Sequence, residues 1–273
     1  KTLMQAMAVA SANDASVAVA EGLWGSVEEC LKRMNQRAAD LGMTKTVFYS
    51  VHGLPPDDGK TFDQTSARDM ATLGRELLKH PDILNFTRMK SFSLRPEDSA
   101  KSNTNHLLER MPECDGLKTG YIRAAGFCLT ATAKRDNIRL LAVVMGSDRN
   151  GRFTHTQKIL EEGFSMVQRV TPVQADAQIG KPVAVTDGLK PEVALKAQGS
   201  IDVVVRHNDL DRLSLEITAP TRFEAPVQAE KEAGHVRVML DNKPLGETLL
   251  YTAAAVERKT FKHRLREMIG LEP

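Results

Sequence analysis

The chain has 273 residues, of which 41% are hydrophobic and 26% are charged, a composition typical of soluble globular proteins and long enough for two domains. Its 37 basic and 35 acidic residues are interspersed and leave a net charge of +2, which argues against a nucleic-acid partner. The three cysteines (Cys30, Cys114 and Cys128) lack metal-binding spacing, so the sequence indicates no disulfide framework, no metal site and no cofactor.

The first residues predict two helices joined by a tight connection. Leu3, Met4 and Met7 lie at helical spacing, and that segment ends at Ser11-Ala12-Asn13. We expect Asp14 to cap a second helix over 15–20. A connection between two helices is a place where side chains are presented to a cleft. Because the chain opens on Lys1, already within a helical pattern, we expect its natural N-terminus to be absent.

The middle of the chain predicts an α+β fold. An amphipathic pattern over 26–41 ends at Gly42, and a second helix opens at Ser66 and closes before Pro81. A short strand at 90–94 and a polar loop over 99–105 come next. Apolar runs over 127–133 and 138–145 predict strands, and 153–167 predicts a helix. Together these segments predict helices on one side of an antiparallel sheet.

The stretch 115–121, Asp-Gly-Leu-Lys-Thr-Gly-Tyr, is where we expect the chemistry. The glycine after Lys118-Thr119 leaves room for a ligand backbone to approach, because Gly120 has no Cβ. The Lys118 cation and the Thr119 hydroxyl are groups that hold a carboxylate, and the N–H of Tyr121 can face a developing oxyanion. A plain alternative is an ordinary strand edge on which Lys118 is a surface cation.

Past Pro172 the sequence changes character. Short β-rich runs separated by Gly and Pro predict a small all-β domain over 171–255. The tail, 256–273, predicts a basic amphipathic helix with an apolar stripe formed by Phe261, Leu265, Met268 and Ile269. Such a helix lies either on an anionic membrane surface or on its own domain, and the sequence leaves both alternatives open.

Several separate motifs, taken in order, resemble one family, the low-molecular-mass penicillin-binding proteins, which are the bacterial D-alanyl-D-alanine carboxypeptidases. The likeness runs from Lys1 to about Arg169, and the β-rich part with its tail resembles the C-terminal domain and membrane anchor of that family. The resemblance divides the chain into a peptidase domain (1–170), a β domain (171–255) and a tail helix (256–273). The matching segments are Ser11-Ala12-Asn13-Asp14-Ala15, Val51-His52-Gly53-Leu54, Thr65-Ser66-Ala67-Arg68-Asp69-Met70-Ala71, Asn105-His106-Leu107-Leu108, Asp115-Gly116-Leu117-Lys118-Thr119-Gly120-Tyr121 and Ala125-Gly126-Phe127.

The resemblance implies a serine-type carboxypeptidase that removes the terminal D-alanine of peptidoglycan stem peptides through an acyl-enzyme, binds β-lactam antibiotics, and lies in the periplasm on the outer face of the inner membrane. It implies three catalytic residues, with Ser11 relaying protons, Asn13 holding the substrate amide and Lys118 supporting the relay. The implied substrate-binding residues are Thr119, Gly120, Tyr121 and Arg152.

Each of these residues also has a plain interpretation. Ser11 and Asn13 are ordinary residues for a connection between helices, and Arg152 is an ordinary solvated residue of a first helical turn.

The sequence departs from the family pattern in two places. No serine is followed three residues later by lysine, so the Ser-x-x-Lys nucleophile and base of the family are missing from these residues. We therefore expect a fragment of a longer protein that is inactive alone by the family mechanism. Thr104 stands where members of the family can carry a basic residue. Two alternatives remain: a non-catalytic peptidoglycan-binding scaffold and a β-lactamase, the latter opposed by the β-rich domain and the basic tail.

Overall fold

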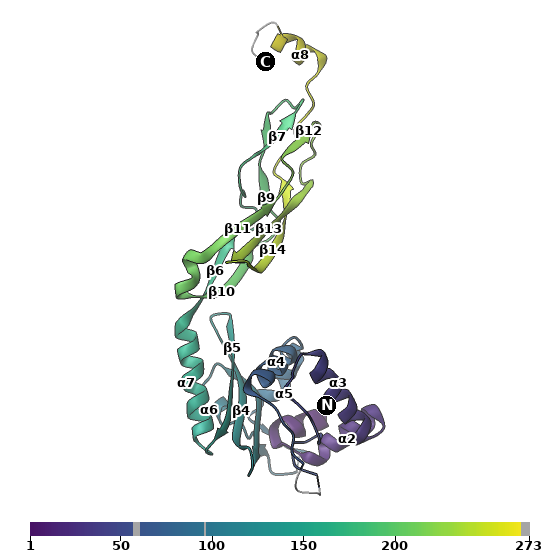
Figure 1. The fold of residues 1–273 in the computed structure, drawn as a ribbon, viewed down its shortest axis with the longest axis vertical. Helices are drawn as coiled ribbons and strands as arrows, with labels where there is room; N and C mark the ends of the chain where they lie inside the picture. The colour runs from purple at the N-terminus through teal and green to yellow at the C-terminus, as the bar shows by residue number, and fades with distance from the viewer. Residues whose placement is uncertain (57–60, 96, 269–273) are drawn as a thin grey trace. The chain divides into compact units, whose positions relative to one another are not determined.

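The computed structural model describes residues 1–56, 61–95 and 97–268, the last three of them by backbone alone. The chain forms two compact units, Lys1–Ser165 and Met166–Pro273, called the N-terminal and C-terminal units below (Figure 1). Helices and strands mix in the first unit and strands dominate the second, which confirms the predicted α+β class.

An antiparallel sheet forms the centre of the N-terminal unit. Its strands are β3 (Cys114–Ile122), β4 (Gly126–Arg135) and β5 (Ile138–Ser147), in the spatial order β3-β4-β5. Leu129, Ala131 and Ala133 of β4 are buried, which explains the apolar run in the sequence. The two predicted strands are therefore confirmed.

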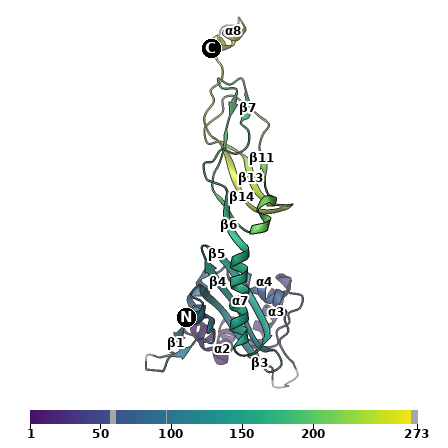
Figure 2. The ribbon, with the colours of Figure 1, turned by 90° about the vertical axis from the view of Figure 1, so that its left-hand side faces the viewer.

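Helices cover both faces of this sheet, so the prediction of helices on one side is wrong. Gly74 of α4 (Ala67–Leu77) faces Leu141, and Gly163 of α7 (Gly151–Met166) faces Leu140. Successive residues of a strand point to opposite faces, so α4 and α7 lie on opposite sides of β5. Figures 1 and 2 show α7 along one face of the strands, with α4 on the other.

The N-terminal helices differ from the prediction in where the second one begins. The first, α1 (Thr2–Gln5), continues into the π-helical η1 (Ala6–Ala10), which ends at Ser11 in a left-handed conformation (φ 54°). The second, α2 (Asn13–Trp24), begins before Asp14. Asp14 therefore does not cap it, because its carboxylate accepts a hydrogen bond from the N–H of Ala15 inside the first turn.

Helices α3 (Val27–Asp40) and α4 begin at the serines that open their predicted segments. Ser26 caps α3 by accepting a hydrogen bond from the N–H of Glu29 at 3.1 Å. Ser66 caps α4 by accepting one from the N–H of Asp69 at the same distance.

Short elements connect α4 to the sheet. They are η2 (Pro81–Ile83), α5 (Leu84–Thr87), β1 (Ser91–Phe92), β2 (Lys101–Ser102) and α6 (Leu107–Arg110). Because β2 pairs with β1, the segment predicted as a polar loop contains a strand.

The C-terminal unit consists mainly of strands packed around one apolar core. A four-stranded antiparallel sheet has the order β11-β13-β14-β9; β10 pairs with β6, and β12 and β8 flank β7. Val236, Val238 and Leu250 lie fully buried in the core. The elements are β6 (Val167–Val173), β7 (Val183–Thr186), β8 (Glu192–Val193), β9 (Leu195–Ala197), β10 (Ile201–Arg206), η3 (His207–Arg212), β11 (Leu213–Thr218), β12 (Arg222–Glu224), β13 (Glu232–Leu240) and β14 (Lys243–Thr252).

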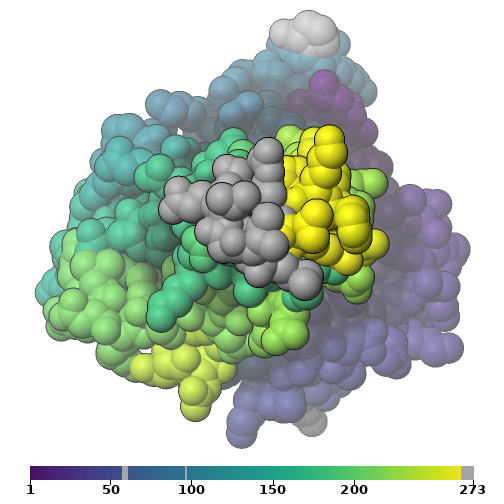
Figure 3. All heavy atoms as spheres, turned by 90° about the horizontal axis from the view of Figure 1, so that it is seen from above, coloured from purple at the N-terminus to yellow at the C-terminus, as the bar shows by residue number. Residues whose placement is uncertain are grey.

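The tail helix α8 (Phe261–Met268) begins later than the predicted position 256. Val256 is only 2% exposed and forms a β-bridge with Val227, so this part of the tail belongs to the core of the unit. Residues 269–273, which include Ile269 of the predicted apolar stripe, lie outside the described residues. Figure 3 shows the described atoms of α8 in yellow at the surface. In the part of the chain that the structure describes, no helix is long and apolar enough to cross a membrane.

Candidate active site

A hydrogen bond between Ser11 and Lys118 joins the end of η1 to the middle of β3. The Lys118 ammonium Nζ donates to Ser11 Oγ at 2.9 Å, across 107 positions of sequence. Ser11 is exposed, and its left-handed backbone turns the chain between η1 and α2. The tight connection predicted from the sequence therefore places a serine hydroxyl against the lysine of the Lys-Thr-Gly segment.

Lys118 occupies an unusual environment for a lysine. Burial, which disfavours the charged amine, and then repulsion from the Arg152 guanidinium lower the pKa of Lys118 from 10.5 to about 8. Its Nζ also donates to the carbonyl oxygen of Thr119 at 3.1 Å. None of the ion pairs found among the described residues includes Lys118. Its partners are thus two neutral oxygens, and part of its population is uncharged near neutral pH.

Thr119 is buried, and its hydroxyl pairs with that of Thr104. The sequence marked Thr104 only as a departure from the family pattern. The Thr104 and Thr119 hydroxyl oxygens lie 2.7 Å apart. The Thr104 N–H donates to the carbonyl of Val9 at 3.3 Å, which connects the same segment to η1. Thr104 is therefore part of this site, and no sequence signal marks that hydroxyl pair.

Arg152 is buried at the start of α7, with 8% of its surface exposed, which rules out the interpretation as a solvated first-turn residue. Its guanidinium lies 5.0 Å from the Phe127 ring centroid and 4.6 Å from that of Phe153. Its Nη1 donates weakly to the Gly120 carbonyl at 3.4 Å, and in the described part of the chain its buried Nε has no hydrogen-bond partner. Burial, and then the charge of Arg149, lower its pKa. A cation in this condition favours an anionic ligand.

The other predicted site residues, Tyr121, Gly120 and Asn13, make fewer contacts with Ser11, Lys118, Thr119 and Arg152. Tyr121 is 54% exposed and stacks on Phe127, with ring centroids 4.1 Å apart. Gly120 is exposed, and a Cβ built there would meet only Cys128, at 3.9 Å. Asn13 is exposed at the start of α2, and no hydrogen bond of its side chain occurs among the described residues. The structure thus connects Ser11 to Lys118 and Gly120 to Arg152 by hydrogen bonds, and in the described part of the chain no side-chain hydrogen bond joins Asn13 to either pair.

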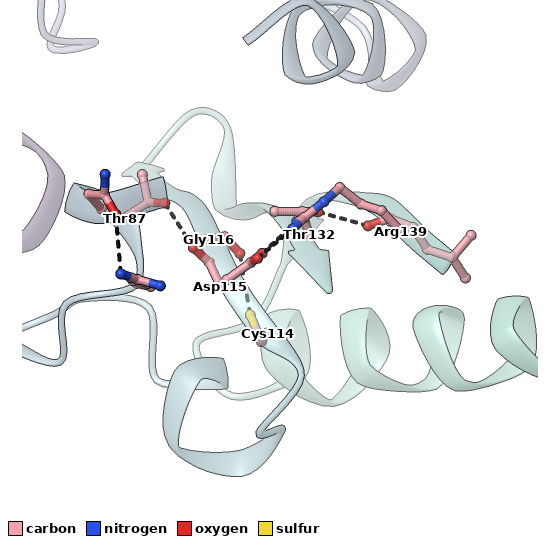
Figure 4. A network of polar contacts seen from close by, with 9 residues as sticks. Thr87, Cys114, Asp115, Gly116, Thr132 and Arg139 are labelled. Atoms are coloured by element: carbon pink, nitrogen blue, oxygen red, sulfur yellow. Dashed lines mark hydrogen bonds and ion pairs between the residues drawn. The ribbon is translucent and has the colours of Figure 1, made fainter. Parts of the chain in front are cut away.

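A polar network fixes the first half of β3 (Figure 4). The carboxylate of Asp115 receives two hydrogen bonds from the Arg139 guanidinium of β5, at 2.8 and 2.7 Å, and Arg139 also donates to the Thr132 hydroxyl at 2.9 Å. Such a bidentate pair fixes the geometry of both side chains. Because Asp115 lies three positions before Lys118 on the same strand, this network holds the segment that carries Lys118.

The same stretch of β3 is also held from α5. The Thr87 hydroxyl donates to the Asp115 carbonyl at 2.8 Å, and the Asn105 amide donates to the Gly116 carbonyl at 3.3 Å. Gly116 is buried, and a Cβ built on it would lie 2.6 Å from the Thr87 Oγ1. The glycine before Leu117-Lys118 is therefore required by the close approach of Thr87.

The site is thus rich in cations and hydroxyls. Lys118 and Arg152 supply positive charge beside the hydroxyls of Ser11, Thr104 and Thr119, a set of groups that suits a carboxylate or another oxyanion. Within the described ranges, no cluster of three or more His, Cys, Asp or Glu residues is suited to a metal ion. The arrangement supports proton transfer and anion binding.

Two family models match most of the chain. Residues 1–149 match the D-alanyl-D-alanine carboxypeptidase family, and residues 168–258 match the C-terminal domain of penicillin-binding protein 5. The first match contains the Ser11–Lys118 pair, and the second covers most of the C-terminal unit.

Individual relatives agree with these models. The D-alanyl-D-alanine carboxypeptidase DacF of Bacillus subtilis is 34% identical over 99% of this chain and 69% of its own length. The crystal structure of penicillin-binding protein 5 from Haemophilus influenzae has a TM-score of 0.65 at 28% identity and covers 94% of this chain and 74% of that chain. The cefotaxime-bound penicillin-binding protein D2 of Listeria monocytogenes has a TM-score of 0.55 at 34% identity and covers 59% of this chain and 65% of that chain.

The close approach of Thr87 to Gly116 predicts coupling between these positions. Gly116→Ala should lower the free energy of unfolding by roughly 1–3 kcal/mol, because the new Cβ overlaps the Thr87 hydroxyl. In a Thr87→Ala background the same change should cost less, since Oγ1 is gone. Urea unfolding of the four proteins of this double-mutant cycle measures the coupling. Strictly additive losses would show that the contact does not determine the need for glycine.

The lowered pKa of Lys118 predicts a pH-dependent contribution to stability. Between pH 8 and 10.5 the unfolded chain binds a proton at this lysine that the folded chain has already released. The free energy of unfolding should therefore rise with pH across this window. Below pH 8 the folded state bears the full cost of burying the charged Lys118 amine, and above pH 10.5 that cost is absent because the amine is neutral in both states. Subtracting the same urea-unfolding series for Lys118→Met isolates this contribution. A difference that is flat with pH would contradict the lowered pKa.

Proposed function

The chain belongs to the D-alanyl-D-alanine carboxypeptidase family, the low-molecular-mass penicillin-binding proteins, and we propose that it forms one wall of the catalytic cleft of a serine-type carboxypeptidase. The substrate is a peptidoglycan stem peptide that ends in D-alanine, and the products are free D-alanine and the shortened peptide. The observation that carries this proposal is the hydrogen bond between Lys118 and Ser11, on the strand that also carries Thr119.

In this proposal Ser11 passes a proton to the leaving amine of D-alanine. Lys118 holds the Ser11 hydroxyl in place, and its positive charge favours movement of the proton toward the substrate. Asn13, exposed at the start of α2, binds the substrate amide once substrate enters. The Asp115–Arg139 pair acts only by holding β3, so both are positioning residues.

Carboxylate binding is the part of the proposal that the site chemistry supports most directly. The Thr119 hydroxyl and the Arg152 guanidinium bind the terminal carboxylate of the substrate, and the Thr104 hydroxyl orients that of Thr119. Gly120 leaves space for the peptide backbone, and the Tyr121 N–H faces the developing oxyanion. Thr104 thus contributes a hydroxyl where family members can carry a basic residue.

The nucleophile and its base come from outside these 273 residues in our proposal. No serine of this sequence has a lysine three positions later, so this polypeptide alone does not hydrolyse the stem peptide by the family mechanism. A segment that supplies this pair would have to place its serine and lysine beside Ser11 and Lys118. The β-lactam complex of the Listeria relative supports β-lactams as ligands of the completed site.

Adding an upstream Ser-x-x-Lys segment from the encoding gene should give covalent labelling by a fluorescent penicillin. The 273-residue chain alone is the control and should not be labelled. In the extended protein, Ser11→Ala should slow release of D-alanine from a D-alanyl-D-alanine peptide by about 100-fold or more, because the proton relay is lost. An extended protein that folds, as judged by circular dichroism, but takes no label would contradict a carboxypeptidase. A labelled protein that rapidly hydrolyses a chromogenic cephalosporin would indicate a β-lactamase.

A folded, unlabelled protein that cosediments with purified sacculi would instead indicate a peptidoglycan-binding scaffold.

The tail supports a periplasmic location at the outer face of the inner membrane. Phe261 is 80% exposed and Leu265 is also exposed, so α8 presents apolar side chains to solvent. One basic residue of α8 forms an ion pair within the C-terminal unit, and another is exposed to solvent. Arg264 pairs with Asp187 at 3.1 Å within the C-terminal unit, and Lys262 is exposed. We propose that α8 rests on an anionic membrane surface through Phe261, Leu265 and Lys262 while Arg264 ties it to its own unit.

Binding to vesicles tests the tail. The chain should bind vesicles that contain anionic lipid, and binding should weaken as salt rises because the charges are screened. Phe261→Ser should weaken binding, since it removes exposed apolar surface. Leu215→Ser, on the exposed edge strand β11 of the same unit, is a matched control and should leave binding unchanged. Equal binding to neutral vesicles, or no binding to either, would contradict this role of α8.

A further inference from the structure

The Ser11–Lys118 pair has the features of a nucleophile with its base. The Ser11 hydroxyl is exposed, and the Lys118 amine lies 2.9 Å from it in a half-buried position. Serine–lysine pairs at this distance act as nucleophile and base in several unrelated hydrolases. Ser11 also stands in a left-handed turn two positions before α2 and is exposed to solvent.

The surroundings of Lys118 favour an amine that accepts a proton. Charged groups on the surrounding elements include Asp14 in the first turn of α2, Arg139 on β5 and Arg152 on α7. Asp14 accepts the N–H of Ala15 and Arg139 is paired with Asp115, so neither forms an ion pair with Lys118 in the described structure. Arg152 is the one whose charge acts on Lys118, and it opposes protonation.

An anion formed next to Ser11 would find two sources of stabilisation. Arg152 is more than nine-tenths buried, and its Nε lacks a partner among the described residues. The 12-residue helix α2 begins two positions after Ser11, and its N-terminal N–H groups favour negative charge. The site therefore offers a nucleophile, a base and positive potential without any further residue.

We propose that Ser11 and Lys118 form a serine–lysine dyad that accepts an acyl or phosphonyl group onto Ser11 Oγ from a donor whose leaving group departs more easily than the amine of a β-lactam, such as an aryl ester or a phosphonyl fluoride. This reaction goes beyond the proposed carboxypeptidase activity, in which Ser11 moves a proton and forms no covalent bond. It requires only the residues of this chain, so it stands whether or not a Ser-x-x-Lys segment completes the cleft.

With a phosphonyl fluoride, one bond to phosphorus forms and another breaks. The neutral Lys118 amine takes the hydroxyl proton of Ser11 as Oγ attacks phosphorus. The new Oγ–P bond forms while the P–F bond breaks, and fluoride leaves with the bonding electron pair. Lys118 then returns its proton to water. An aryl ester reacts in the same way, with an Oγ–acyl bond formed and a phenolate released.

A fluorophosphonate probe tests the dyad on the 273-residue chain itself. We expect one label per chain, mapped to Ser11 by peptide mass spectrometry, with a rate that rises with pH to half its maximum near pH 8. Lys118→Met should slow labelling by about 100-fold or more, because the base is lost. Lys118→Arg should slow it as much, since arginine keeps the charge but does not release its proton. Lys158→Met, a 74% exposed lysine of α7, is the control and should react normally.

Each other outcome overturns the proposal. Label on another serine, or equal labelling of urea-unfolded protein, would show that Ser11 is not activated. Normal labelling of Lys118→Arg would show that charge alone matters. No label on the folded chain would show that the pair does not act as nucleophile and base. Ser11→Ala is an additional variant, and mapping the label on the unchanged chain keeps the test valid even if that variant fails to fold.

Discussion

Lys118 has no acidic partner among the residues that the structure describes, and this is the constraint on which the N-terminal unit depends. A partly buried ammonium is costly unless polar groups surround it, and here the partners are the hydroxyl of Ser11 and the carbonyl of Thr119. This requirement joins the N-terminal helices to the central sheet. It also explains why so many polar contacts, from Asp115–Arg139 to Thr87, fix the strand just before Lys118.

The consequence for function is a site that combines two cations with hydroxyls and few negative charges. Arg152 is held between the rings of Phe127 and Phe153, which fixes its position without neutralising it. Lys118 and Arg152 therefore repel each other, and this repulsion contributes to the lowered pKa of Lys118. An anionic ligand would relieve the repulsion, which links substrate binding to the protonation of the lysine.

The sequence predicted most elements because local patterns determine them. Apolar runs predicted β4 and β5, and helical patterns predicted α3 and α4. Where tertiary contacts decide, prediction failed. The left-handed turn at Ser11 starts α2 before Asp14, and burial of Val256 in the β core delays the tail helix to Phe261. The side of the sheet on which a helix lies also depends on contacts that no local pattern reveals.

The site was predictable in its residue types and not in its geometry. Motif order pointed to Ser11, Lys118 and Thr119, but composition gave no sign that Arg152 is buried. The pairing of Thr104 with Thr119 was equally hidden, because it joins two hydroxyls 15 positions apart through the fold. The burial of Arg152 and the pairing of the two threonines result from packing between distant segments, so only the structure reveals them.

Direct titration of the Lys118 amine by side-chain NMR tests the central claim most simply, because it reports the environment of that one atom. We expect a midpoint near pH 8 that moves upward when Arg152 is replaced by methionine. An ordinary midpoint near 10.5, unmoved by that replacement, would show that Lys118 is not held beside Ser11 and Arg152.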